Sequence, residues 1–241
     1  MRATGAPDRP ARGRERAGAG RPRRAPTGED AGGGRAADLR RAAARIFHEK
    51  GYDATSIQDI AEAVGMLKGS VYYYIDAKED LLFEVINEAH QRGLALLEQW
   101  ESLDVDALTR LRLSIEGHVH NNLENHVDVG VFFHDFRSLS PERRAEIIEN
   151  RDLYDRYLRE VITAGQAEGS IDPDADPKLT TMAILGMMNW VYQWYREDGP
   201  DAPEKIAREF ADLIVAGLAV RPDDRPRHEL GTTGITREKL P

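Results

Sequence analysis

Apolar residues recur at intervals of three and four along almost the whole of residues 38–220, and this spacing limits the chain to helices. The segment "DLRRAAARIFHEKG" (38–51) shows the pattern first, with its arginines outside the apolar stripe and a glycine at its end. No segment shows a convincing alternation of apolar and polar residues, which is typical of strands. The sequence therefore predicts an all-α fold. The first stripe consists of Leu39, Ala42, Ala43, Ile46 and Phe47.

The expected helices form two groups. Two short helices follow the first, and the spacing of Thr55 and Gln58 predicts a capping box at the start of the second helix. Asp76 and Glu79 have the same spacing at the start of the fourth helix. The fourth helix keeps an apolar stripe as far as Trp100 and is on the order of 35 Å long, which is enough to link two domains. Further helices are expected at about 105–125 and 127–139, from Ser140 and Pro141 to near Gly169, from Asp176 through "LTTMAILGMMNWVYQWYRE" as one element, and from Pro203 with Ile206, Phe210, Leu213, Ile214, Gly217 and Leu218 buried.

This organisation predicts an N-terminal domain of three small helices followed by a helical bundle. The domain bounds are 38–83 for the helix-turn-helix domain and 84–220 for the bundle. Residues 221–241 are expected to be a flexible tail. Residues 1–37 carry nine arginines against four acidic residues and almost no large apolar residue, which predicts a disordered basic arm. Such an arm can touch the DNA backbone, and an inert leader or a start codon assigned too early remains equally open.

Composition excludes several classes of protein. The chain has no cysteine, so disulfides, thiolate metal sites and cysteine nucleophiles are absent together. The longest nearly unbroken apolar run, 182–192, is shorter than the roughly 20 residues that cross a bilayer, and the N-terminus lacks the apolar segment of a secretory signal. A cytoplasmic protein without a membrane partner is expected. The net charge of −9 argues against a general-purpose basic binder of nucleic acid.

Three consecutive tyrosines in "GMLKGSVYYYI" (65–75) cannot all enter one core, because successive helical residues point about 100° apart. If 67–74 is helical, Leu67, Val71, Tyr74 and Ile75 share the inward side. The outward side then holds Lys68, Gly69, Tyr72 and Tyr73, with Ser70 at the edge between the two faces. An amine, a hydroxyl, phenols and a glycine suit contact with a DNA major groove. Tyrosines of a short helix can instead be semi-buried packing residues, but two short helices around a glycine-containing turn favour a helix-turn-helix.

The run "ARIFHEKGYDATSIQDIAEAVGMLKGSVYYYIDAKEDLL" (44–82) resembles the TetR family of bacterial transcriptional regulators. The resemblance implies that one helix crosses the DNA backbone, that the next reads the groove, and that a lysine at the start of the fourth helix reaches a phosphate. It brings Tyr74 to the DNA, whereas the helical wheel turns it inward. The sequence departs from the family pattern at Leu67 and Ile75. The residues that the resemblance assigns to DNA are Thr55, Ser56, Lys68, Gly69, Ser70, Tyr72, Tyr73, Tyr74 and Lys78.

The bundle carries signs of a dimer and of a cavity. The helix after Asp176 is apolar nearly all round, so it needs cover on both sides, and a second subunit can supply one of them. The resemblance also implies a two-fold homodimer. Polar groups interrupt the apolar stripe of 105–125, and aromatic side chains follow on the neighbouring helices, as in a small-molecule pocket. A solvated rim and an ordinary aromatic core would give the same pattern. The candidate effector residues are His118, Asn122, Phe132, Phe133, Phe136, Met187, Trp190 and Trp194, with Asn125 and Asn189 beside them.

The motifs "GMLKGS" and "NWVYQWY" are similar to those of TetR-type regulators of fatty-acid and steroid catabolism, several of which release DNA on binding an acyl-coenzyme A thioester. This implies a long hydrophobic tunnel with a basic mouth for the phosphates of the coenzyme. Arg137, Arg151 and Arg196 are the available arginines.

No catalytic constellation is evident. His118 and His120 diverge on a helix, as do His134 and Asp135, and the P-loop, Rossmann and nucleophile-elbow patterns are absent. We therefore expect a protein that is not an enzyme and has no cofactor. The prediction is a dimeric repressor that binds a palindromic double-stranded DNA operator and is released by a hydrophobic effector such as an acyl-coenzyme A thioester. The alternative is a sequence-tolerant structural DNA-binding protein without ligand response.

Overall fold

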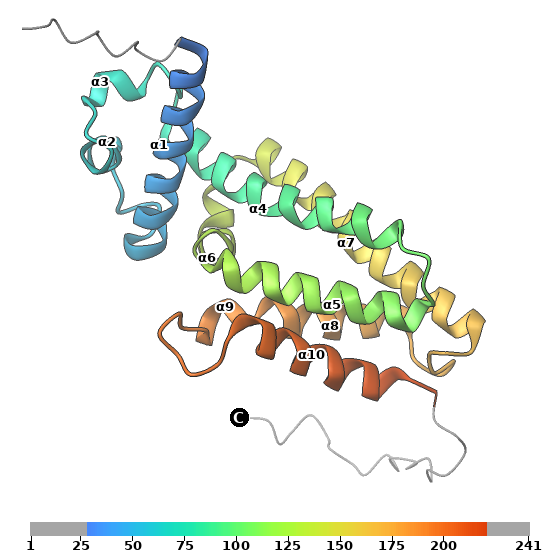
Figure 1. Ribbon diagram of the computed structural model, residues 1–241. Coiled ribbons are helices and arrows are strands. Elements are labelled where there is room, and N and C mark those ends of the chain that lie inside the picture. Colours follow the sequence, from blue (N-terminus) through green and yellow to red (C-terminus); the bar gives the residue numbers. More distant parts are fainter. Residues whose placement is uncertain (1–27, 221–241) are drawn as a thin grey trace, which may run out of the picture.

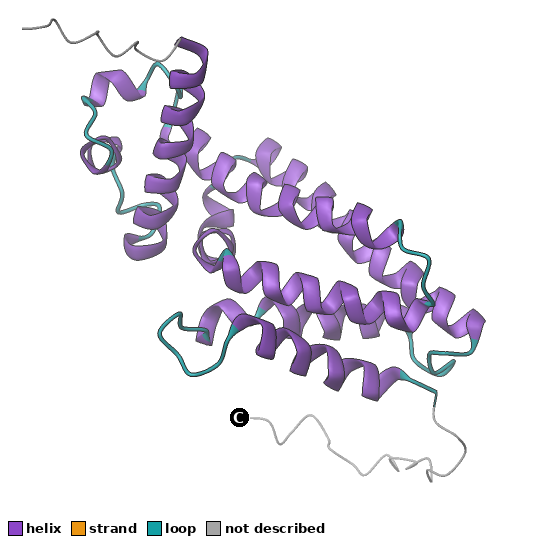
Figure 2. Cartoon of the chain, viewed as in Figure 1, coloured by secondary structure: helices purple, strands orange, loops and turns teal. Residues whose placement is uncertain are grey.

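The computed structural model describes residues 28–220, and throughout this range the regular elements are helices (Figures 1 and 2). The predicted all-α fold is confirmed for the part of the chain described. The predictions for residues 1–27 and 221–241 lie outside the described residues. The helices are α1 (Gly28–Lys50), α2 (Ile57–Ala63), α3 (Lys68–Val71), α4 (Lys78–Glu101), α5 (Ala107–Glu124), α6 (His126–Asp135), the 3₁₀ turn η1 (Phe136–Ser138), α7 (Pro141–Glu168), α8 (Pro177–Asn189), α9 (Val191–Trp194) and α10 (Pro203–Leu218).

Helices α1, α2 and α3 form a small unit at one end of the molecule (Figure 1). Helix α1 begins at Gly28, ten residues before the expected start at Asp38, so part of the expected arm is helical. Gly51 ends α1 and Gly65 follows α2, both at positive φ, which glycine adopts without strain. The core of this unit is formed by Leu39, Ala42, Ala43, Phe47, Ile57, Ile60, Val71, Ile75 and the first turns of α4.

Two predicted caps are displaced by one residue. Helix α2 is capped by Ser56, whose hydroxyl accepts from the Asp59 amide while the Asp59 carboxylate accepts from the Ser56 amide. The predicted pair Thr55 and Gln58 is wrong, because the Thr55 side chain turns inward and donates to the Gly51 carbonyl. A capping box thus forms one position later than the sequence pattern indicated.

The N-terminus of α4 shows the same displacement. The Asp80 carboxylate accepts from the amides of Asp76 and Ala77, which replaces the predicted Asp76 and Glu79 pair. Glu79 instead accepts a 2.8 Å hydrogen bond from the Ser140 amide, immediately before α7. Asp80 also pairs with Arg143 of α7. The start of α4 is therefore joined to the start of α7.

Helices α4 to α10 form the bundle, in which α5 packs against α4, α7, α8 and α10 (Figure 1). Helix α6 lies at the end of the bundle that faces α1. The element expected to be continuous from Asp176 is broken at Trp190, where the short α9 turns against α6 and stacks Tyr192 on Phe133 with ring centroids 4.7 Å apart. The core of the bundle contains Leu97, Trp100, Leu111, Ile115, Val119, Tyr157, Leu158, Ile162, Ile184, Met188, Ile206 and Ile214.

The far end of α4 is fastened to α5. The Arg110 guanidinium donates to the carbonyls of Trp100, Glu101 and Leu103, with a longer 3.4 Å contact to that of Val105. The indole of Trp100 lies so close to Gly117 of α5 that an added Cβ would be 2.3 Å from its Cζ2 atom. The connection between α4 and α5 is therefore held by the Arg110 side chain and by the close packing of Trp100 on Gly117.

An apolar face remains uncovered on α8 and α10. Leu179 and Met182 on α8 and Leu213 on α10 are 63%, 56% and 67% exposed. The prediction that Leu213 and Gly217 are buried is wrong for the single chain, because α10 packs on α5 through Ile206, Ala207, Ala211 and Ile214. This face has the character of an interface rather than of a solvated surface.

Candidate nucleic-acid interface and effector cavity

Helix α3 is a single turn that presents polar and phenolic groups outward. Val71 and Ile75 anchor it in the core at 0% and 5% exposure, while Tyr73 is 88% exposed. Lys68 and Gly69 are also exposed, and space around Gly69 is open, so its backbone is accessible. The outward face predicted from the sequence is therefore present. The chain continues past α3 as a turn, in which the amides of Tyr73 and Tyr74 donate to carbonyls of Ser70 and Val71.

Two residues of this segment differ from the helical wheel. Leu67 was predicted to point inward and is 80% exposed, because it precedes α3 as its N-cap residue and is not part of the helix. Tyr74, for which the wheel and the family resemblance disagreed, is 36% exposed and lies at the edge of the outward face. The inward assignment of Tyr74 is therefore wrong, because α3 ends before it. Ser70 is partly buried, as expected for a residue between the two faces.

The remaining predicted DNA residues, Thr55, Ser56 and Lys78, lie in or bond to the turn before α2. Thr55 is 3% exposed, so a contact between its hydroxyl and DNA is contradicted. Ser56 is exposed at the start of α2, where its hydroxyl lies 2.6 Å from the Asp59 carboxylate. The Lys78 ammonium donates to the carbonyls of Tyr52 and Thr55, both at 2.7 Å, and lies 4.1 Å from the centroid of the Tyr52 ring. Lys78 thus joins the loop between α1 and α2 to α4, and a phosphate contact can use only its third N–H.

A cavity of about 720 Å³ lies inside the bundle, walled by α4 to α9. Of the predicted effector residues, His118, Asn122, Phe132, Phe133 and Trp190 line it. Residues that the prediction missed come mainly from α4 and α7. The small side chains at Ala89 and Gly93, on the inward stripe of α4, were the available sequence signal for a hollow core. The missed residues include Ala89, His90, Gly93, Leu94, Asn150, Tyr154, Asp155, Arg159, Leu185 and Tyr192.

Three predicted effector residues do not line the cavity. Phe136 begins η1 and packs with the core of the helix-turn-helix unit, because α6 ends one residue before it. Met187 is 37% exposed on the outer side of α8. Trp194, in the separate α9, stacks on Phe210 of α10 with ring centroids 6.3 Å apart. The break at Trp190 removes Trp194 from the face that a continuous helix would have given it.

One part of the cavity wall is polar. The Nε2 atom of His118 lies 3.0 Å from the Asn189 Oδ1 atom and 3.0 Å from the Asn122 amide nitrogen. Burial lowers the pKa of His118 to about 4, so its ring is neutral at physiological pH. The ring of Tyr154 meets it edge-on, with centroids 4.8 Å apart. Burial also lowers the pKa of His90, whose ring lies edge-on against Phe132 at 4.6 Å.

Arginine at the cavity comes from α7. Arg151 is exposed and lines the cavity, with its guanidinium carbon 6.0 Å from the centroid of the Phe132 ring. Arg159 also lines it and pairs with Asp155 at 2.6 Å. Of the three arginines considered from the sequence, Arg137 and Arg196 lie elsewhere, and Arg196 pairs with Asp198 at 3.2 Å. Arg151 is thus the member of that set available to a bound molecule.

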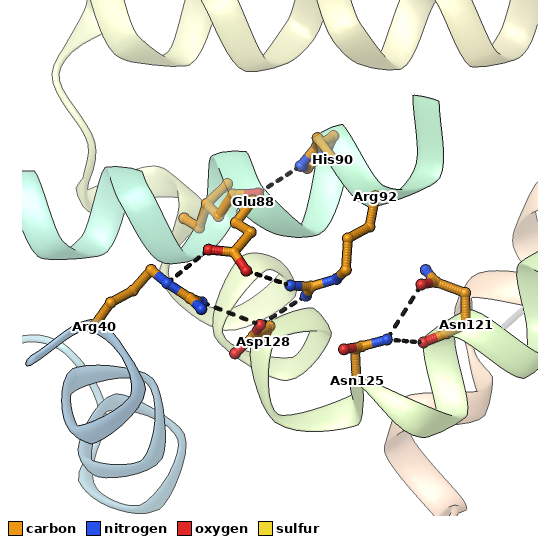
Figure 3. Close-up of polar contacts among 8 residues, drawn as sticks. Arg40, Glu88, His90, Arg92, Asn121, Asn125 and Asp128 are labelled. Atoms are coloured by element: carbon orange, nitrogen blue, oxygen red, sulfur yellow. Dashed lines mark hydrogen bonds and ion pairs between the residues drawn. The ribbon is translucent and has the colours of Figure 1, made fainter. Parts of the chain in front are cut away.

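A cluster of charged residues joins the helix-turn-helix unit to the bundle (Figure 3). Arg40 of α1 lies 2.6 Å from Glu88 of α4 and 3.8 Å from Asp128 of α6. Arg92 of α4 contacts the same two carboxylates at 3.1 and 2.7 Å. Helix α6 also contributes Val129, Phe132 and Phe133 to the cavity. One short helix therefore contacts both the cavity and the helix-turn-helix unit.

The described residues, 28–220, contain neither a membrane-spanning helix nor a cluster of metal ligands. No helix there is long and apolar enough to cross a membrane. That part of the chain also holds no group of three or more His, Cys, Asp or Glu side chains placed to bind a metal ion.

Comparison with known proteins gives two family matches. Residues 39–85 match the model of bacterial regulatory proteins of the tetR family, and residues 104–218 match the tetracyclin repressor-like C-terminal domain. The two models together span both parts of the structure.

Individual relatives agree with these matches. The repressor KstR2 of Rhodococcus jostii is 29% identical over 80% of this chain and 97% of its own. The solved structure of the regulator PfmR from Thermus thermophilus is 35% identical, covers 74% of this chain and 97% of that one, and superposes with a TM-score of 0.70. The solved structure of AibR in complex with isovaleryl coenzyme A and operator DNA is 29% identical, covers 74% of this chain and 97% of that one, and has a TM-score of 0.68.

Proposed function

Because the chain belongs to the TetR family of bacterial transcriptional regulators, we propose that it represses genes from a palindromic operator as a homodimer and leaves that DNA when an acyl-coenzyme A thioester enters its cavity. The family binds operator DNA and is not enzymatic, which confirms the prediction that the chain is not an enzyme. Action on the bacterial chromosome places the protein in the cytoplasm in this proposal.

The observation that carries the DNA-binding part is the outward face of α3 and the turn after it. Tyr73 is 88% exposed beside the exposed Lys68 and Gly69. An exposed aromatic side chain in such a group favours a surface that binds a partner. A phenol can donate to a phosphate and pack on a thymine methyl group, and an ammonium can bind a phosphate or a guanine edge. Lys68, Gly69, Ser70, Tyr72, Tyr73 and Tyr74 are the proposed groove residues, with Ser56 at the flanking backbone.

The uncovered face of α8 and α10 supports the dimer. Leu179 on α8 and Leu213 on α10 are exposed apolar side chains of this face. Two copies of this face would make a four-helix interface with two-fold symmetry. Such a dimer presents two α3 helices about 34 Å apart, one turn of DNA, and so reads a palindromic site.

The cavity supports the effector part of the proposal. Most of its lining is apolar and aromatic, as in small-molecule sites, and a volume of about 720 Å³ suits an acyl group. Exposed Arg151 gives the opening a cation for a phosphate of the coenzyme. The relative AibR was solved with isovaleryl coenzyme A, so a thioester is a consistent effector class.

Helices α4 and α6 provide the coupling in this proposal. Both line the cavity, and both reach α1 through the ion pairs of Arg40. An effector that binds more tightly to the DNA-free arrangement shifts the dimer toward it. The displacement of α4 would change the separation of the two α3 helices.

The test is a thermal-shift screen with acyl-coenzyme A thioesters of different chain and ring size, followed by DNA binding with and without each hit. The DNA is the region upstream of the gene for this protein and a scrambled duplex of equal length. Tight binding to the first duplex, weakened by a hit, is the expected result. Equal, strongly salt-dependent binding to both duplexes without a ligand response would support a structural DNA-binding protein instead.

A further inference from the structure

Trp190, at the junction of α8 and α9, is accessible to solvent and also lines the cavity. It is 61% exposed. A residue with both properties lies where the cavity opens to the surface. Tryptophan offers a large, rigid and planar contact area that loses little conformational entropy on binding. The exposed indole therefore favours a contact with the part of a ligand that stays at the opening.

The neighbours of Trp190 support its ring and leave space beside it. Tyr192 of α9 makes a T-shaped contact with Trp190, with ring centroids 6.3 Å apart, and stacks on Phe133 of α6 at 4.7 Å. Gly186 lies four residues before Trp190 on α8, so the two share one side of that helix. An added Cβ at Gly186 would meet no atom within 4 Å. The ring is thus supported by Tyr192 and borders open space at Gly186.

Arg151 of α7 belongs to the same opening. It is exposed and lines the cavity. Helix α8 returns along α7 (Figure 1), with Arg151 about 26 Å before the end of α7 and Trp190 about 20 Å after the start of α8. The guanidinium and the indole therefore lie at a similar level of the bundle.

Charge alone gives this opening little affinity for a nucleotide. The arginines and aspartates that line the cavity are equal in number, so their formal charges cancel, and Arg159 is already paired with Asp155 at 2.6 Å. A nucleotide held here needs a further contact that does not depend on charge. Stacking of a base on an aromatic ring is such a contact, because it uses the flat faces of both rings. The four charged residues are Arg151, Asp152, Asp155 and Arg159.

We propose that the indole of Trp190 stacks on the adenine base of the effector, while Arg151 faces a phosphate and the acyl group fills the cavity. The inference rests on the proposed function, because it takes the effector to be an acyl-coenzyme A thioester. Apolar side chains such as Leu94, Val129 and Leu185 line the cavity and suit the acyl chain. The nucleotide is then the part that stays at the opening, within reach of the exposed ring.

The first test uses the ethenoadenine analogue of octanoyl-coenzyme A, whose fluorescent base is quenched when it stacks on an indole. Titration of the full chain should quench the emission of the base. Trp190→Leu keeps an apolar side chain but removes the indole, so the probe should bind without quenching. The control is Trp194→Leu, because Trp194 is 47% exposed but stacks on Phe210 and does not line the cavity. This variant should quench the probe as the wild type does.

The second test compares octanoyl-coenzyme A with octanoyl-phosphopantetheine, which lacks the adenosine. Calorimetric titration gives the dissociation constants. Trp190→Leu should weaken the binding of octanoyl-coenzyme A about tenfold, the usual effect of losing one stacked base. It should change the binding of octanoyl-phosphopantetheine by less than about twofold, since that ligand has no base to stack. Thermal melting and sedimentation velocity verify that both variants are folded and have the wild-type subunit number.

The outcomes separate this inference from the proposed function. A probe that binds the wild type without quenching, or an equal loss of affinity for both thioesters in Trp190→Leu, overturns the inference and leaves the thioester proposal standing. A monomeric Trp190→Leu beside an unquenched wild-type probe also overturns it, and assigns the indole to contact with a second subunit. Failure of every octanoyl probe to bind the wild type rejects the inference and the thioester proposal together.

Discussion

Arg40 of α1 and Glu88 of α4 form a 2.6 Å ion pair across the boundary between the helix-turn-helix unit and the bundle. Arg92 and Asp128 extend the pair into a cluster that includes α6 (Figure 3). The side chains of Arg40 and Asp128 are each 16% exposed, so solvent screens this cluster less than a surface pair. The cluster fixes how α1 sits on both helices that line the cavity.

Arg40→Ala should weaken the communication between effector and operator. We expect the factor by which the effector raises the DNA dissociation constant to fall about fivefold, which corresponds to about 1 kcal/mol of coupling free energy. DNA titrations with and without effector measure this factor. The control is Arg41→Ala, whose ion pair with Asp38 stays within α1. Full coupling in Arg40→Ala would contradict a role for the cluster.

Replacement of the outward residue Lys68 of α3, or of Tyr73 in the turn after it, should weaken operator binding without unfolding the protein. Lys68→Ala and Tyr73→Ala should each raise the dissociation constant by roughly tenfold to a hundredfold, because each side chain is exposed and contacts the duplex in our proposal. Lys68→Ala should also lower the slope of log affinity against log salt by about one.

The contrasting variant of the same segment is Val71→Ala. Val71 is completely buried, so this change should lower the melting temperature through the cavity it leaves. Wild-type DNA affinity in both Lys68→Ala and Tyr73→Ala would refute the assignment of this face.

A charge in the uncovered face of α8 and α10 should separate the subunits. Leu213→Glu places a carboxylate on a position that is 67% exposed in the single chain and covered in the proposed dimer. Sedimentation velocity at micromolar concentration should show a monomer. In DNA titrations this monomer should bind operator half-sites only weakly. Leu103→Glu, in the loop after α4, should stay dimeric. A dimeric Leu213→Glu would mean that another surface forms the interface.

Stability should fall as the pH drops below neutral, owing to His118. Its pKa is about 4 in the folded protein and 6.5 when exposed, so the unfolded chain binds the extra proton first. The contribution of His118 is fully present above pH 6.5 and is lost as the pH falls to about 4, at a total cost of about 3 kcal/mol. Burial lowers the pKa of His90 in the same direction. Urea denaturation at several pH values measures the slope.

The variant His118→Gln should flatten that dependence, because it keeps a polar side chain of similar reach without a titrating ring. His120→Gln, one of the histidines outside the cavity lining, is the control and should keep the wild-type dependence. An unchanged slope in His118→Gln would assign the acid sensitivity to other groups.

Gly117→Ala should destabilise the bundle. An added Cβ would lie 2.3 Å from Trp100, so α4 and α5 would have to separate, at a cost of about 1–3 kcal/mol in the free energy of unfolding. Gly34→Ala in α1 is the control, since nothing lies within 4 Å of its added methyl group. Thermal unfolding of the two variants side by side tests the difference.

The sequence predicted those features that depend on periodicity. The stripe with Leu39, Ala42 and Phe47 is buried as expected, and the outward position of Tyr73 follows from the burial of Val71. Such positions depend on which side of a helix meets a core, and the order of apolar residues encodes that directly.

Features that depend on helix ends were harder to predict. Both caps lie one residue later than predicted, and Leu67 lies just outside α3. The break at Trp190 separates Trp194 from the cavity. Local sequence specifies such boundaries weakly.

Arg110 and the contact between Trp100 and Gly117 fix the C-terminal end of α4. A movement of α4 therefore displaces mainly its N-terminal end. A pivot of α4 about the fixed end displaces the Lys78 end furthest, and the start of α7 moves with it because Glu79 and Asp80 bond to Ser140 and Arg143. Helix α4 has 24 residues, and a swing of about 5° over its length of roughly 36 Å carries the Lys78 end by about 3 Å. That end bonds directly to the turn before α2, so in the proposed mechanism a small angular change of α4 becomes a translation of the helix-turn-helix unit.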